Sequence, residues 1–123
     1  AIAHRESAEK SAPAFMRDAG TGRAAADPVP ALIAQLASKD PRLRAFAADE
    51  LAGRGAAAAP AVPALRHALS DADPRVRSSS VAALGAIVPP DSEVVLNIRH
   101  ALADKNEDVR FSARVALWRL GTH

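Results

Sequence analysis

Apolar side chains recur every three or four positions along two stretches of the chain, with polar positions between them. The first stretch places its apolar residues on one helical face, at Val62, Leu65 and Leu69. The second stretch does the same, with one serine on the face, at Val76, Ser80, Leu84 and Ile87. This spacing predicts amphipathic α-helices. Strand patterns are absent, so we expect an all-α fold.

The apolar pattern repeats at an offset of 33 residues, which is the length of one helix pair in many repeat proteins. Leucines mark the same two places in each unit, at Leu36, Leu69 and Leu102 and at Leu51, Leu84 and Leu117. We therefore expect three units, at residues 28–55, 60–88 and 92–121.

Each unit also contains a start signal for a second helix. The run Asp-Pro-Arg-Leu-Arg at 40–44 returns as Asp-Pro-Arg-Val-Arg at 73–77, and more loosely as Asn-Glu-Asp-Val-Arg at 106–110. An Asp or Asn side chain suits the N-cap, and proline suits the first helical position. Prolines also stand near the start of the first helix of each unit. The sequence therefore predicts about six helices in three pairs.

These motifs resemble a known family. The runs Ala-Val-Pro-Ala-Leu at 61–65, Leu-Ser-Asp-Ala-Asp-Pro-Arg-Val-Arg at 69–77 and Ala-Ala-Leu-Gly at 82–85 are similar to bacterial HEAT-like repeats of the type also found in phycobilisome lyases. The resemblance covers residues 28–121. It implies an α-solenoid of three HEAT-like helix pairs, and such repeats serve mostly as protein-interaction scaffolds.

Residues 1–27 do not join the repeat. The segment is rich in Ala, Gly, Ser and charged residues, and Phe15 and Met16 are its large apolar anchors. This composition predicts a disordered or loosely docked N-terminal leader, with a short helix around 5–11 as an alternative. The repeat domain then occupies residues 28–121.

Composition narrows the function classes. The chain has no cysteine and a net charge of only +2, so it predicts neither a disulfide framework nor a strongly basic nucleic-acid surface. No apolar stretch is long enough to predict a membrane span. We expect a soluble protein without a cofactor. Because the sequence starts at Ala1 rather than Met, a cytoplasmic location and export followed by processing both stay open.

One arginine occupies the same place in every unit, at Arg44, Arg77 and Arg110. A ligand-binding row is one interpretation. We favour a structural arginine ladder, in which each side chain reaches an acidic turn of a neighbouring unit, because the planar guanidinium pairs well with a carboxylate. The candidate acceptors are Asp40, Asp71, Asp73 and Asp104.

Catalytic and metal-binding motifs are missing. The sequence contains no Gly-rich phosphate loop, no His-Glu-x-x-His motif and no recognisable Ser-His-acid set. His67 and His100 share a register, but the first unit has Ala34 there, so a metal site would lack a third ligand. Asp49 and Glu50 are sequence neighbours that point to different sides of a helix. We expect no catalytic residue and no metal.

The second helices are expected to line a concave face, where solenoids of this kind bind partners. Their outward positions predict rows of small side chains that end in an aromatic stripe: Ala45, Asp49 and Ala52, then Ser78, Ala82 and Gly85, then Phe111, Val115 and Trp118. Arg42 and Arg75 at the rim would attract an acidic partner. The stripe predicts partner binding. An equal alternative is that it covers the open end of the core or packs on a missing next repeat, and self-association is a lesser one.

These observations favour a non-enzymatic scaffold or adaptor that binds a protein or peptide. The oligomeric expectation is a monomer, or weak self-association through the C-terminal repeat. Two alternatives are a nucleic-acid-binding module and a non-catalytic subunit of a chromophore lyase. From residue 28 onward the sequence has twelve basic and ten acidic residues, and this near balance argues against nucleic acid as the partner.

Overall fold

A computed structural model describes residues 27–121 as an α-solenoid of three helix pairs, which agrees with the all-α prediction. The first pair is α3 (Val29–Gln35) and α4 (Pro41–Gly53). The second is α5 (Val62–Ala68), preceded by the 3₁₀ helix η2 (Gly55–Ala61), and α6 (Pro74–Ile87). The third is α7 (Val94–His100), followed by η3 (Ala101–Ala103), and α8 (Glu107–Arg119). The described residues contain no strand.

The predicted caps start the three second helices. The carboxylates of Asp40 and Asp73 accept hydrogen bonds from the backbone N–H groups of Arg42 and Arg75, and Pro41 and Pro74 occupy the first helical position. In the third unit the side chain of Asn106 accepts from two backbone N–H groups at the start of α8. Each cap supplies an acceptor to a helix end that otherwise lacks one.

Asp27, which the sequence pattern assigned to the leader, belongs to the start of the solenoid. Its carboxylate accepts a hydrogen bond of 2.9 Å from the backbone N–H of Val29. The remainder of the predicted leader, residues 1–26, including Phe15 and Met16, lies outside the described residues.

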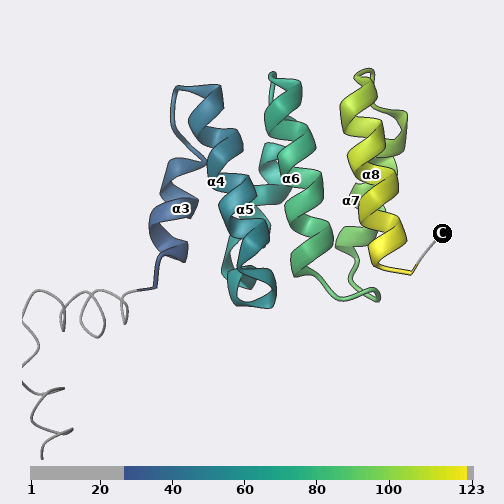
Figure 1. Cartoon of the computed structure of the whole chain (residues 1–123), viewed down its shortest axis with the longest axis horizontal. Helices are drawn as coiled ribbons and strands as arrows, with labels where there is room; N and C mark the ends of the chain where they lie inside the picture. Colours follow the sequence, from purple (N-terminus) through teal and green to yellow (C-terminus); the bar gives the residue numbers. More distant parts are fainter. Residues whose placement is uncertain (1–26, 122–123) are drawn as a thin grey trace, which may run out of the picture.

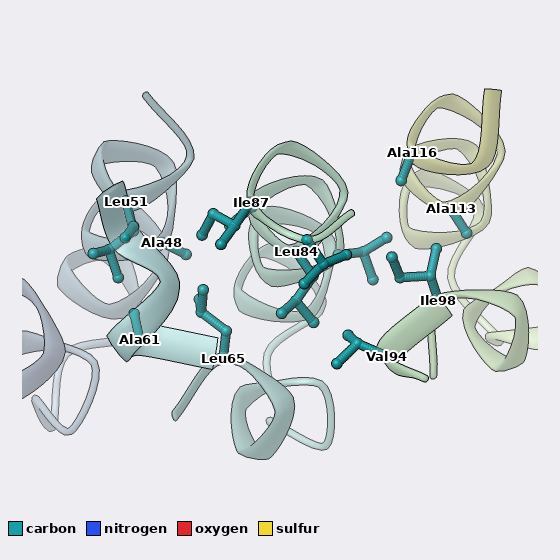
Figure 2. Close-up of a cluster of buried hydrophobic side chains, with 14 of the residues drawn as sticks. Ala48, Leu51, Ala61, Leu65, Leu84, Ile87, Val94, Ile98, Ala113 and Ala116 are labelled. Carbon is teal, nitrogen blue, oxygen red and sulfur yellow. The ribbon is translucent and has the colours of Figure 1, made fainter. Parts of the chain in front are cut away.

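The helices form two layers. Figure 1 shows α4, α6 and α8 side by side, with the shorter first helices of the pairs forming the other layer. Small and branched aliphatic side chains fill the space between the layers, as Figure 2 shows around Leu51, Leu65, Leu84 and Ile98, all of which are fully buried. The buried residues of this core are small or aliphatic. Alanines such as Ala47, Ala48 and Ala113 let the helices approach closely, so that the core is well packed without aromatic side chains.

Ser80 interrupts this aliphatic core. Its side chain is fully buried, and within the described part of the chain its hydroxyl has no hydrogen-bond partner. The equivalent positions in the other two units are Ala47 and Ala113, which are equally buried. A buried hydroxyl without a partner loses its hydrogen bonds to water and gains none in return.

We therefore expect Ser80→Ala to stabilise the fold by about 1 kcal/mol, because it removes this unpaired group. The check is the unfolding free energy from urea titration. Ser79→Ala on the same helix is the control, since it carries the same gain in helix propensity at a position that is only half-buried. An unfolding free energy that rises no more with Ser80→Ala than with Ser79→Ala would contradict this account.

Candidate functional site: the second-helix face and the C-terminal end face

Two of the predicted ladder arginines, Arg44 and Arg77, join their own turn to the turn of the next unit. Within the described residues the third, Arg110, donates only to the Asp104 carbonyl of its own turn. The Nε and Nη2 atoms of Arg44 donate to the carboxylate of Asp71 at 2.8 and 3.0 Å, and its Nη1 donates to the Ser38 carbonyl at 2.8 Å. Arg77 pairs with Asp104 in the same way, at 2.9 and 3.0 Å, and its Nη1 donates to the Asp71 carbonyl. Both contacts span 27 residues, so the ladder connects successive units.

The ladder also sets the charge state of the acidic turns. Hydrogen bonds from Arg77 lower the pKa of the Asp104 carboxyl, although burial opposes the shift. Burial is the largest influence on Asp71 and would raise its pKa, but the hydrogen bonds from Arg44 and from the Asp73 backbone outweigh it, so that this pKa is also lowered. The carboxylates of Asp71 and Asp104 therefore stay charged and paired with Arg44 and Arg77.

The predicted rim arginines pair within their own turns. Arg42 contacts Asp40 at 3.3 Å and Arg75 contacts Asp73 at 2.8 Å. Hydrogen bonds from the Arg75 side chain and backbone lower the pKa of Asp73 to about 2. The positive charge that these arginines could offer an acidic partner is therefore partly balanced by the carboxylates beside them.

The second-helix face, defined as the solvent-exposed side of α4, α6 and α8, brings together only some of the predicted binding residues. Ala82, Phe111 and Val115 line one shallow depression of about 110 Å³ between α6 and α8. Ser78 is half-buried, and its hydroxyl hydrogen-bonds the Ser112 hydroxyl across the same two helices. Arg42 lies a full unit away, at the start of α4.

The outward assignment of Gly85 is wrong. This residue is buried, and a Cβ atom built on it would lie 2.6 Å from the Cβ of Ala116 on α8. Gly85 is therefore the point where α6 and α8 pack most closely, and the glycine is required by this approach. Ala52, which the sequence placed in the same outward row, is also half-buried and packs against the core.

The packing of Gly85 against α8 bears on where the aromatic stripe of Phe111, Val115 and Trp118 lies. In the 33-residue repeat, Ser78 and Gly85 correspond to Phe111 and Trp118. Because Ser78 and Gly85 contact α8, the same register directs Trp118 toward the C-terminal end of the solenoid, whereas Phe111 also lines the depression that α8 shares with Ala82 of α6. We call the side of α8 with Arg110, Phe111, Arg114 and Trp118 the C-terminal end face. Val115 lies at its border with the second-helix face.

Large apolar side chains are well exposed on α8. Phe111 is 58% exposed, Val115 38% and Trp118 66%, and the guanidinium of Arg114 lies 5.8 Å from the centre of the Phe111 ring. Sequence patterns had already indicated the stripe, but Arg114 was missed, because its equivalents Ala48 and Val81 are buried core residues.

Other surface features of the described residues offer few groups that could bind a ligand or metal. A depression of about 480 Å³ lies between α3 and α5. Its lining is mainly apolar, and the two charged residues in it, Arg44 and Asp71, pair with each other. His67 and His100 are exposed on the first-helix layer. Residues 27–121 contain no group of three or more His, Cys, Asp or Glu side chains that could hold a metal ion. Within the same residues, no helix is long and apolar enough to cross a membrane.

Comparison with known proteins agrees with this architecture. Residues 29–118 match the family described as HEAT repeats, which is most of the chain and includes all three helix pairs. A search of curated proteins found no match. The paired helices, the 33-residue period and the family match together show that the chain belongs to the HEAT-repeat family.

Proposed function

We propose that this chain is a non-catalytic scaffold or adaptor that binds a protein partner through α8. HEAT repeats commonly serve as protein-interaction scaffolds. The observation that carries the proposal is the exposed apolar stripe of Phe111, Val115 and Trp118, in a chain whose aromatic content is only 3%. Aromatic side chains are enriched among the residues that contribute most to binding.

The binding surface in this proposal extends over two sides of α8. Phe111 and Val115 border the depression beside Ala82, so a partner seated there touches the second-helix face, which we take as the concave face of the solenoid. Trp118 continues the same surface onto the C-terminal end face. The contribution of Arg42, Arg75 and Ser78 to this surface is expected to be smaller, because their polar groups are already hydrogen-bonded.

Two other functions receive less support. A nucleic-acid-binding role needs a clustered positive surface, and Arg44, Arg75 and Arg77 are all paired with aspartates. A role as a chromophore-lyase subunit rests on the resemblance to phycobilisome-lyase repeats, and no further observation on the described residues favours it.

A retention experiment tests the proposed function. Immobilised wild-type chain and the Phe111→Ala/Trp118→Ala variant are incubated with nuclease-treated lysate of the source organism, and the bound proteins are identified by mass spectrometry. We expect at least one protein that wild type retains and the double variant loses.

Leu96→Ala supplies the matched control. Leu96 is 62% exposed on α7, so its loss removes a similar apolar group from the other layer. Circular dichroism of each variant establishes that it is folded. Equal retention by both variants and wild type, or no specific protein at all, would refute binding through α8.

A further inference from the structure

Two equivalent grooves lie between the first helices of successive units. The apolar groove lies between α3 and α5, and the polar groove lies between α5 and α7. Each groove ends at a ladder carboxylate, which is that of Asp71 in the first and that of Asp104 in the second. The linings differ at three places of the 33-residue repeat, where Ile33, Ala37 and Ala64 of the apolar groove are replaced by Arg66, Ser70 and Asn97. Neighbouring units thus offer two different chemistries at the same position.

The apolar groove has room for an aliphatic side chain. Its volume is about 480 Å³, and two of its lining residues, Leu36 and Ala68, are buried in the solenoid. The charged groups at its end are already used, because Arg44 donates to the Asp71 carboxylate and to the Ser38 carbonyl. A charged side chain of a ligand would find few partners there, whereas an aliphatic one would be removed from water.

The polar groove, of about 230 Å³, offers hydrogen-bond donors to an anion. Within the described residues, the side chains of Ser70 and Asn97 make no hydrogen bond, and Arg66 has one long contact, 3.8 Å to the Glu93 carboxylate. The carboxylate at the end of the groove, that of Asp104, is paired within the ladder. A carboxylate that enters this groove would therefore meet free donors and no unpaired acid.

The surrounding charge also favours an acidic ligand. The first helices and the turns that follow them, at 28–39, 62–72 and 94–105, contain two acidic residues, Asp71 and Asp104, and both pair with ladder arginines. The basic residues of the same segments are exposed, at Lys39, Arg66, Arg99 and Lys105. A helix dipole offsets only about half a positive charge at its C-terminal end, so this layer of the solenoid stays positive.

A peptide matches the two grooves better than a nucleic acid does. A peptide can present an aliphatic side chain and a carboxylate on one chain, whereas a run of phosphates would leave the apolar groove empty. The three segments around the grooves contain no Phe, Tyr or Trp, which are the side chains on which unpaired bases stack.

The separation of the grooves determines the spacing of the two ligand side chains. Equivalent points on neighbouring packed helices lie about 10 Å apart. A polyproline II chain rises about 3.1 Å per residue with three residues per turn, so its residues i and i+3 point to the same side about 9 Å apart. In a β-strand the same two residues would point to opposite faces. A polyproline II segment that crosses α5 therefore reaches both grooves with residues three positions apart.

We propose that the two grooves bind a protein segment in the polyproline II conformation. The segment inserts an aliphatic side chain into the apolar groove and, three positions away, an Asp or Glu into the polar groove. Its carboxylate accepts hydrogen bonds from Arg66 and Asn97. The site lies on the layer formed by α3, α5 and α7 (Figure 1), so it is a second binding surface that does not depend on the one proposed on α8.

NMR titration of the isotope-labelled full chain with a synthetic peptide tests this proposal. The probe peptide is Ser-Gly-Ser-Leu-Pro-Pro-Glu-Pro-Ser-Gly, in which the prolines favour polyproline II. One matched peptide has Lys in place of Glu, a second has Ser in place of Leu, and a third lacks one of the two prolines between Leu and Glu. A single-stranded oligothymidylate is the nucleic-acid probe.

We expect the probe peptide to shift the amide resonances of residues that line the two grooves, such as Ala37, Arg66 and Asn97, and to leave those of Phe111 and Trp118 unchanged. The Kd should be on the order of 1 mM, because the ligand is short and the contact is small. Each of the three matched peptides should bind at least about fivefold more weakly, because it loses the charge, the aliphatic group or the spacing.

Variants of the chain assign the two grooves. Arg66→Ala should raise the Kd about fivefold, and Ala37→Glu should raise it at least as much, because it places a carboxylate in the apolar groove. The matched controls are Arg99→Ala, which removes the equivalent exposed arginine of α7, and Ala34→Glu, which adds an acid to α3. Neither position lines a groove, so both controls should leave the Kd within about twofold of wild type. Unchanged resonances elsewhere establish that each variant is folded.

Several results would overturn the inference. These are an absence of shifts in the grooves, equal affinity for the probe and its Lys or Ser counterpart, and an equal loss of affinity with Arg66→Ala and Arg99→Ala. Tighter binding of oligothymidylate at the same resonances would assign the layer to nucleic acid instead. Groove shifts that depend on protein concentration without peptide would assign it to self-association. None of these results bears on α8, which the retention experiment with Phe111→Ala/Trp118→Ala tests separately.

Discussion

Arg77→Ala should lower the free energy of unfolding by about 3 kcal/mol, because the substitution removes one partner of a largely buried ion pair. Arg77 is only 7% exposed and donates to the carboxylate of Asp104 and to the carbonyls of Asp71 and Ala72. Its loss leaves a partly buried carboxylate without its counter-charge and two turn carbonyls without their donor. A domain of this size would then melt on the order of 10 to 20 °C lower.

Arg110→Ala is the matched control for this prediction. Arg110 has the same register, but within the described residues it holds only the Asp104 carbonyl, so its loss should cost less than about 1 kcal/mol. Urea titration of the two variants and wild type measures both values. Equal losses at positions 77 and 110 would show that the contact to the neighbouring carboxylate adds nothing to stability.

Gly85→Ala should destabilise the fold by about 2 kcal/mol, since overpacking a close helix contact usually outweighs the gain in helix propensity. The added Cβ would lie 2.6 Å from the Cβ and 3.0 Å from the Cα of Ala116, so α6 and α8 would have to separate. The sign of the effect is informative, because glycine to alanine inside a helix is stabilising where space is available.

Gly53→Ala provides that comparison. Gly53 is the last residue of α4, and a Cβ there would meet nothing within 4 Å, so the same substitution should have a neutral or stabilising effect. Adding Ala116→Gly to Gly85→Ala should recover part of the loss. Thermal unfolding of wild type, the two single variants and the double variant measures the coupling. Stabilisation by Gly85→Ala would contradict the close approach of the two helices.

Much of the fold could be predicted from sequence because the physical signals are local and repeated. Asp40, Asp73 and Asn106 each provide a cap, prolines start two of the second helices, and the leucines at a 33-residue offset fill equivalent places in every unit. Three copies of the same signals make chance agreement improbable. The assignment to the HEAT-repeat family follows from the same repetition.

The candidate site was less predictable because helical periodicity gives a residue's face on its own helix but not the neighbour that the face meets. Phe111 and Trp118 were correctly expected to be exposed, yet Trp118 was assigned to the concave row although its equivalent, Gly85, is in contact with the next unit. A glycine and a tryptophan at equivalent positions cannot pack in the same way. The 27-residue step from Arg44 to Asp71 likewise becomes evident only once the turns are placed beside each other.

We propose that the apolar stripe of α8 is surface available for binding rather than part of the core. The melting temperature of Phe111→Ala/Trp118→Ala tests this most directly. Because the two side chains are 58% and 66% exposed, the double variant should lose less than about 1 kcal/mol per site and should still melt cooperatively within about 10 °C of wild type. A loss of the cooperative transition, or a drop as large as that expected for Arg77→Ala, would show that the stripe belongs to the core and would contradict this account.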